Sequence, residues 1–200
     1  MRMCKAHLVK NADPSHDWLH ALRVYKMAIY LGKTESANMN ILLPSALLHD
    51  VEGCSKLSND SDKNKNITRN ILEECGISEE TIDRICETIA KHSYSKGMQA
   101  VTLEEKILQD ADRLDALGAI GIARLFSVAG HLGRPLYSLR DPFCKKRKPC
   151  DIKYALDHFY SKILKLRSVL HTEAARDLCI SRTSFVEMFI DQINDEICNK

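Results

Sequence analysis

The sequence contains the apolar segment Ile41-Leu42-Leu43-Pro44-Ser45-Ala46-Leu47-Leu48, which is followed directly by His49-Asp50. An imidazole and a carboxylate therefore stand side by side where an apolar helix is expected to end. Together, histidine nitrogen and carboxylate oxygen form a donor set that suits divalent first-row ions. His20 precedes this pair on another expected helix, and Asp112 follows it. The order His, His-Asp, Asp predicts a metal site.

The composition is that of a soluble globular protein, because 44% of the 200 residues are hydrophobic and 28% are charged. The sequence has no apolar run of the roughly 18 residues that span a bilayer. Residues 1–7 lack the apolar stretch of an export signal, so we expect a cytoplasmic protein without membrane association. A net charge of +2 is too small to predict general binding to nucleic acids or membranes.

The cysteines are scattered without any Cys-x-x-Cys pair, so we expect most of them to be reduced thiols. Cys144 and Cys150 flank a basic run, but their spacing exceeds that of usual zinc ligand pairs, which argues against zinc there. The basic run itself is the one feature that favours an RNA-associated helical protein. Because Tyr137 and Phe143 are the few aromatic residues near it, we do not expect nucleic acids as partners.

Helical periodicity and capping signals recur along the chain, whereas strand signals are nearly missing. The first expected helix starts at Asp13-Pro14 and ends at Gly32. The others cover about 38–49, 65–75, 79–92, 102–129, 152–170 and 172–198, with connections at 52–66 and 130–149. We expect one all-α domain, a helical bundle over residues 1–200. Its metal core covers about 13–130, and C-terminal helices at about 151–198 pack on it.

Charged side chains are embedded in the otherwise apolar segment 107–126. Because a buried carboxylate without a partner would be expelled or protonated, an arginine or a cation must balance each one. Two interpretations stay open: Asp-Arg pairs that only tie helices together, or carboxylates that bind a metal. The charged residues of this segment include Asp110, Asp112, Arg113, Asp115 and Arg124.

The pattern resembles the HD superfamily of metal-dependent phosphohydrolases, in which His, His-Asp and Asp ligands are carried on an all-α bundle. The family's His-x-x-x-Val falls on His20, its His-Asp step on His49 and Asp50, and its Ala-Asp-Arg-Leu on Asp112. The resemblance implies that these four residues hold a divalent ion, with Asp110 as the alternative to Asp112. Mixed nitrogen and oxygen donors with two open positions suit Mn²⁺, Mg²⁺, Co²⁺ or Fe²⁺.

The resemblance extends to a stand-alone HD subgroup whose members look like nucleotide pyrophosphohydrolases. The subgroup's segments match Ile89-Ala90-Lys91-His92-Ser93, the run from Asp110 to Arg124, and His158-Phe159-Tyr160-Ser161-Lys162. It implies hydrolysis of a (deoxy)nucleoside triphosphate to the monophosphate and pyrophosphate. The alternatives are a nucleoside monophosphate phosphatase and a catalytically idle module that binds a nucleotide or a metal. The sequence leaves the base, the sugar and the oligomeric state open, and a homodimer is compatible with it.

The same chemistry suggests further site residues. A divalent ion activates water and polarises a phosphoryl oxygen, so no covalent enzyme intermediate is needed. Glu52 and His92 are the expected catalytic residues, Glu52 by orienting water or accepting its proton; the alternative makes Glu52 a solvated loop acid. Glu104 is expected to belong to a helix cap. Substrate contacts are expected from His16, Lys91, Arg113, Arg124, His158 and Lys162.

Overall fold

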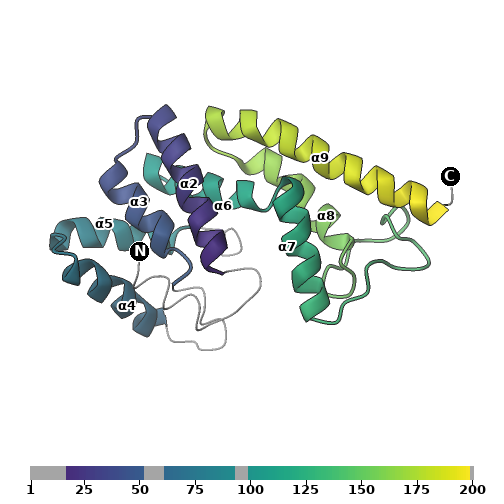
Figure 1. The fold of residues 1–200 in the computed structure, drawn as a ribbon, viewed down its shortest axis with the longest axis horizontal. Coiled ribbons are helices and arrows are strands. Elements are labelled where there is room, and N and C mark those ends of the chain that lie inside the picture. The colour runs from purple at the N-terminus through teal and green to yellow at the C-terminus, as the bar shows by residue number, and fades with distance from the viewer. Residues whose placement is uncertain (1–16, 52–60, 93–98, 199–200) are drawn as a thin grey trace. The chain divides into compact units, whose positions relative to one another are not determined.

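The computed structural model describes residues 17–51, 61–92 and 99–198, with the backbone alone for residues 61–66. These residues form helices and no strand, which confirms the predicted all-α class (Figure 1). The chain divides into two compact units, residues 1–112 and 113–200. A single domain over the whole chain stays a prediction. None of the described helices combines the length and apolarity that a membrane crossing requires.

The first unit is built around α3 (Met39–Leu48), which packs on both α2 (Trp18–Thr34) and α5 (Glu79–Ala90) (Figure 1). α4 (Ser61–Glu74) packs on α5, and its first turns occupy residues that were wrongly predicted to form a connection. Apolar side chains from these four helices and the turn after α3 form the core, namely Ala21, Ile41, Leu48, Val51, Ile71, Leu72, Ile82, Ile85 and Ile89.

The bounds of α2 differ from the prediction. Asp17 is the N-cap of α2, and its Oδ1 accepts a hydrogen bond of 2.7 Å from the backbone N–H of His20, whereas the predicted start at Asp13 lies outside the described residues. Gly32 lies inside the helix instead of ending it. A Cβ at Gly32 would lie 2.6 Å from Cδ2 of Leu42, so the missing side chain is what lets α3 approach α2 so closely. Gly32 therefore has a packing role.

The long helix predicted over 102–129 is wrong, because it is two helices, α6 (Leu103–Asp115) and α7 (Gly118–His131). Gly118 has a φ of +70°, a conformation that favours glycine. A Cβ at Gly121 would lie 2.1 Å from the carbonyl oxygen of Ala116, so the turn closes only around a glycine. Apolar residues continue through the turn, and periodicity alone therefore merged the two helices.

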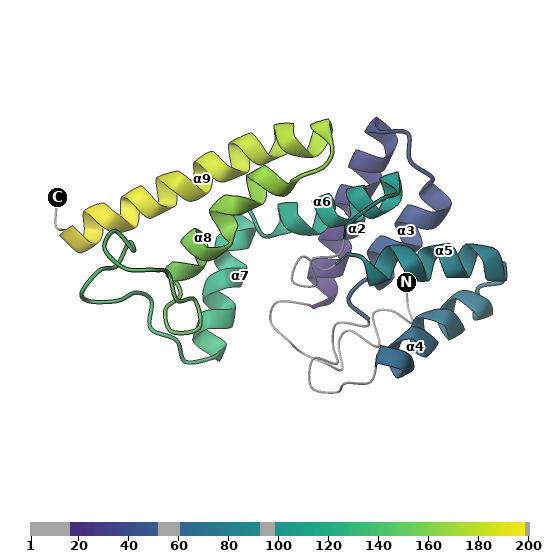
Figure 2. The same cartoon turned by 180° about the vertical axis from the view of Figure 1, so that it is seen from behind.

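The second unit contains α7, α8 (Asp157–Ser161), the 3₁₀ helix η3 (Ile163–Val169) and α9 (Glu173–Cys198) (Figure 2). The single helix predicted over 152–170 is therefore wrong as well, since α8 and η3 replace it. α9 packs on α7 and η3, and η3 packs on α8. Three aromatic rings bring α7, α8 and α9 together, with centroids 5.9, 6.1 and 6.2 Å apart: Phe126, Phe159 and Phe189.

The connection between α7 and α8 is fixed by a buried ion pair. The fully buried carboxylate of Asp157 accepts hydrogen bonds of 2.5 and 2.7 Å from the guanidinium of Arg147 and one of 2.6 Å from the backbone N–H of Cys150. The pKa of the Cys144 thiol is raised to about 11, first by burial and then by this carboxylate. The absence of zinc at Cys144 and Cys150 stays a prediction from their spacing.

Candidate metal centre

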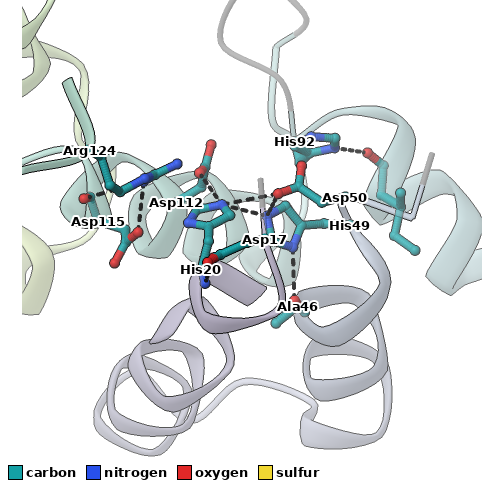
Figure 3. A network of polar contacts seen from close by, with 10 residues as sticks. Asp17, His20, Ala46, His49, Asp50, His92, Asp112, Asp115 and Arg124 are labelled. Atoms are coloured by element: carbon teal, nitrogen blue, oxygen red, sulfur yellow. Dashed lines mark hydrogen bonds and ion pairs between the residues drawn. The ribbon is translucent and has the colours of Figure 1, made fainter. Parts of the chain in front are cut away.

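Four polar side chains from three segments of the first unit point toward one another (Figure 3). His20 lies in the first turn of α2, His49 and Asp50 follow the end of α3, and Asp112 lies in the last turn of α6. Nε2 of His20 lies 3.3 Å from Nε2 of His49 and 3.1 Å from Oδ2 of Asp50. It also lies 3.4 Å from Oδ1 of Asp112. The turn after α3 and the two helices thus aim their donors at one point.

This arrangement has the donor set and spacing of a cation site. The donor atoms of His20, His49 and Asp112 all lie within 4.8 Å of one another. Oδ2 of Asp50 joins them at 3.4 Å from Nε2 of His49. Two imidazole nitrogens and two carboxylate oxygens are ligands that divalent first-row ions accept. The cluster could therefore hold a metal ion.

The hydrogen bonding of His49 orients the ring so that it could bind a metal ion. Its Nδ1 donates to the carbonyl oxygen of Ala46 at 2.8 Å, which leaves the lone pair of the neutral ring on Nε2, the atom that faces His20. Burial lowers the pKa of His49, and the neighbouring Asp50 carboxylate only partly opposes this effect. Metal-ligating histidines commonly donate their second N–H to such a carbonyl.

Asp112, and not Asp110, contributes its carboxylate to the cluster. Burial disfavours the charge of Asp112, but hydrogen bonding to His20 and the nearby His49 outweigh this and hold its pKa below the ordinary value. Asp110 is fully buried. Asp115 accepts a hydrogen bond of 2.7 Å from Arg124. The structure therefore shows an Asp-Arg pair at Asp115, whereas metal binding by Asp112 stays a prediction.

The two residues that follow α5 differ in what they contact. The ring of His92 lies edge-on to that of His49, with centroids 5.3 Å apart. Nδ1 of His92 donates to the carbonyl oxygen of Ile89 at 2.6 Å. Lys91 instead forms an ion pair of 2.8 Å with the buried carboxylate of Glu105. His92 therefore lies beside the cluster, whereas a phosphate contact from Lys91 stays a prediction.

Two predicted substrate residues, Arg113 and Arg124, lie in the second unit and have protein partners there. Arg113 donates to the carbonyl oxygen of Val169 at 2.6 Å. Arg124 donates to the carboxylate of Asp115, as described above, and so ties the end of α6 to α7. These contacts stabilise the unit, and nothing in them tests a role in substrate binding.

His158 and Lys162 also belong to the second unit. Nδ1 of His158 lies 2.9 Å from Oδ2 of Asp151, and Lys162 lies between α8 and η3. Their predicted contact with the substrate is untested. His16 and Glu52, predicted for the substrate and for catalysis, lie outside the described residues.

The predicted cap at the start of α6 involves a different glutamate. Glu105 exchanges hydrogen bonds with Thr102: its backbone N–H donates to Oγ1 at 3.3 Å, and its Oε2 accepts from the backbone N–H of Thr102 at 3.2 Å. Glu104 accepts from the backbone N–H of Asn38, the N-cap of α3, at 2.8 Å. The Thr-x-x-Glu spacing, applied strictly, selects Glu105.

Two supporting residues are absent from the predicted site. Asp17 holds the backbone of His20, and its position three residues earlier is an N-cap signal that the sequence offered. Nε2 of Gln109 donates to the carbonyl oxygen of Lys91 at 2.6 Å. A contact between residues so far apart in sequence leaves no local signal.

The HD domain family model matches residues 18–117, which include all four clustered side chains. The chain belongs to the HD family. This HD chain is 34% identical over 194 residues to the uncharacterized protein YpgQ of Bacillus subtilis (strain 168). The alignment covers 95% of this chain and 88% of YpgQ. The match confirms the resemblance inferred from the sequence.

Solved structures agree with this assignment. A crystal structure of Bacillus subtilis YpgQ in complex with ADP aligns with a TM-score of 0.78 at 34% identity, covering 98% of the HD chain and 96% of that chain. An HD-superfamily hydrolase from Bacillus thuringiensis aligns with a TM-score of 0.79 at 37% identity, covering 100% and 95%. These similarities assign the HD chain to the HD-superfamily hydrolases.

Proposed function

We propose that this chain is a metal-dependent phosphohydrolase that cleaves a (deoxy)nucleoside triphosphate to the monophosphate and pyrophosphate. The observation that carries the proposal is the convergence of His20, His49 and Asp112 on one point, with Asp50 beside them. A nucleotide substrate is supported by the crystal structure of the relative YpgQ in complex with ADP. We infer that the reaction takes place in the cytoplasm.

The protein residues that would hold the ion are His20, His49, Asp50 and Asp112. When bound, a divalent ion such as Mn²⁺, Mg²⁺, Co²⁺ or Fe²⁺ lowers the pKa of water and polarises a phosphoryl oxygen. The Ala46 carbonyl fixes the ring of His49, so little rearrangement is needed on binding.

His92 is the described residue best placed to contact the reacting group. Its Nδ1 is engaged by Ile89, so its Nε2 is the ring atom that can exchange a hydrogen bond with the phosphate or with the attacking water. Its position beside His49 places it next to the ligands. We assign to Glu52 the orientation of the water, from the sequence alone. The predicted contacts of the substrate with Lys91 and with the cationic residues of the second unit complete the proposal.

The test is hydrolysis by metal-free protein reconstituted separately with Mn²⁺, Mg²⁺, Co²⁺ and Fe²⁺. Ribo- and deoxynucleoside mono-, di- and triphosphates are supplied, and pyrophosphate and phosphate are measured separately. We expect pyrophosphate from triphosphates. Phosphate release from monophosphates would instead support the monophosphatase, and loaded protein that hydrolyses none of these nucleotides would support an idle module.

Two matched variants connect any activity to the cluster. His49→Ala and Asp50→Ala should abolish hydrolysis and metal retention, with helical circular dichroism preserved. The controls are His131→Ala and Asp195→Ala, which remove the same side-chain types from positions of α7 and α9 outside the cluster. An equal loss of hydrolysis and metal retention in the control and cluster variants would contradict the proposed site.

A further inference from the structure

We propose that Gln109 is a positioning residue that acts through His92. Its side-chain amide holds the backbone of Lys91 and thereby fixes the His92 imidazole against His49. The inference rests on the proposed function, in which His92 contacts the reacting phosphate or water. All the contacts that carry it lie within the first unit.

The first contact is a buried side-chain bond to the end of a helix. Gln109 is 2% exposed, and its Nε2 donates to the carbonyl oxygen of Lys91 at 2.6 Å. Lys91 is the C-cap of α5. Carbonyl groups at a helix C-terminus lack a partner within the helix, so a side chain that binds one there fixes the direction in which the chain leaves. The next residue along that path is His92.

A second contact holds the same residue by its side chain. Nζ of Lys91 donates to Oε1 of Glu105 at 2.8 Å, and the other oxygen of Glu105 accepts from the backbone N–H of Val101 at 2.7 Å. Glu105 and Gln109 are four residues apart on α6 and therefore share a helix face. Asp112 follows Gln109 by three residues on the same helix. One helix thus anchors both the residue before His92 and a predicted metal ligand.

The orientation of the His92 ring depends on where its backbone lies. The carbonyl oxygen of Ile89 accepts from the backbone N–H of His92 at 3.1 Å and from its Nδ1 at 2.6 Å. This double contact holds the ring at an interplanar angle of 81° to the ring of His49. A displacement of the Lys91 carbonyl would move the next Cα and break the geometry of both bonds. Gln109 therefore controls His92 by way of the backbone.

A merely structural role makes a different prediction. If Gln109 only satisfies a buried carbonyl, its loss lowers stability, and any effect on hydrolysis is independent of His92. If it positions His92, its loss lowers kcat but leaves KM and metal retention unchanged, and the effect disappears once His92 is gone. Non-additivity of this kind identifies residues that act as a unit.

The experiment is a double-mutant cycle in full-length protein with Gln109→Leu, His92→Ala and the double variant. We expect Gln109→Leu to lower kcat about 10- to 100-fold. His92→Ala should lower it about 100-fold or more, and the double variant should match His92→Ala. Gln109→Met, which keeps the length of the side chain but removes the donor, is the second variant in case leucine prevents folding. Gln192→Leu, at an exposed position of α9, is the control.

A readout without turnover separates the inference from the proposed function. At alkaline pH, ¹⁵N NMR should show His92 protonated on Nδ1 in the wild type, with the signal assigned by its absence in His92→Ala. A mixture of both tautomers is expected in Gln109→Leu and in Gln109→Met. An unchanged tautomer in these variants would overturn the inference. So would a wild-type kcat in His92→Ala, or a Gln109→Leu substitution that lowers kcat equally in the presence and in the absence of His92. Wild-type protein that hydrolyses no nucleotide would contradict the proposed function alone, because the NMR test still applies.

Discussion

The Nε2 atoms of His20 and His49 face each other at 3.3 Å in the interior of the first unit. Because Nδ1 of His49 donates to Ala46, its Nε2 presents a lone pair toward the other ring. The carboxylates of Asp50 and Asp112 approach the same point. Two imidazole nitrogens and two carboxylate oxygens in so small a space form a donor set that divalent first-row ions accept.

Asp17→Ala should weaken metal binding more than an ordinary helix cap substitution does. Its Oδ1 holds the backbone N–H of His20 itself, so its loss frees the first turn that carries a ligand. Asn38→Ala removes the N-cap of α3, where no predicted ligand lies in the first turn. Each variant should cost about 1 kcal/mol of stability. Isothermal titration with Mn²⁺ should show weaker affinity only in Asp17→Ala, and equal affinities in the two variants would contradict this assignment.

Divalent metal should stabilise the fold through Asp112 and not through Asp110. Mn²⁺ at about 100 times its Kd should add about 2.7 kcal/mol to the free energy of unfolding, because it binds the folded state. Thermal melts with and without metal measure this shift. Asp112→Asn should lose it. Asp110→Asn removes a buried carboxylate outside the cluster, so it should lower the melting temperature but keep the shift. A shift that depends on Asp110 instead would make Asp110 the ligand.

Asp157→Asn should destabilise the protein at neutral pH by about 2 kcal/mol. This is less than the ~3–5 kcal/mol of a fully buried pair, because the Arg147 side chain is 25% exposed. Burial alone would raise the pKa of Asp157, but the hydrogen bonds from Arg147 and Cys150 lower it below the ordinary value. The stabilisation is therefore present above the unfolded pKa of about 3.9 and is lost as pH falls through the lowered folded value.

Urea unfolding of wild type and Asp157→Asn at several pH values checks this dependence. The difference in the free energy of unfolding between the two should be constant near neutrality and shrink below about pH 4. Asp195→Asn, at an exposed position of α9 that is not part of this ion pair, should show no difference from wild type at any of these pH values. A difference in the free energy of unfolding that grows as the pH falls would contradict this assignment of the ion pair.

Gly121→Ala should be destabilising, in contrast to a second glycine of the same helix. Its Cβ would meet the carbonyl oxygen of Ala116 at 2.1 Å, so the turn between α6 and α7 must shift, at a cost of about 1–3 kcal/mol. A Cβ at Gly130, also in α7, would meet nothing within 4 Å. Gly130→Ala should therefore stabilise by up to about 1 kcal/mol. Chemical denaturation measures the free energy of unfolding of both variants, and equal changes in the two would contradict the tight turn at Gly121.

The cluster residues were predictable because each lies in a short segment that resembles the family. His49 and Asp50 became informative together with His20 and Asp112, because the order His, His-Asp, Asp is the family's ligand pattern. The choice of Asp112 over Asp110 needed the family pattern, because spacing alone leaves both carboxylates on one helix. The fold then brings Asp112 to His20.

The contacts that support the cluster were not predictable in the same way. Gln109 meets the carbonyl of Lys91, and Glu104 meets the backbone of Asn38, through tertiary packing that no local pattern records. The break at Gly118 was hidden because apolar residues continue on both sides of the turn. Turn geometry, and not periodicity, decides where such a helix ends.

Anomalous diffraction from a crystal grown with Mn²⁺ would locate the ion relative to the four clustered side chains. We expect one strong peak about 2.0–2.3 Å from Nε2 of His20, Nε2 of His49 and a carboxylate oxygen each of Asp50 and Asp112. A fully loaded crystal whose manganese peaks lie elsewhere, with these four side chains out of reach of any ion, would contradict the proposed metal site.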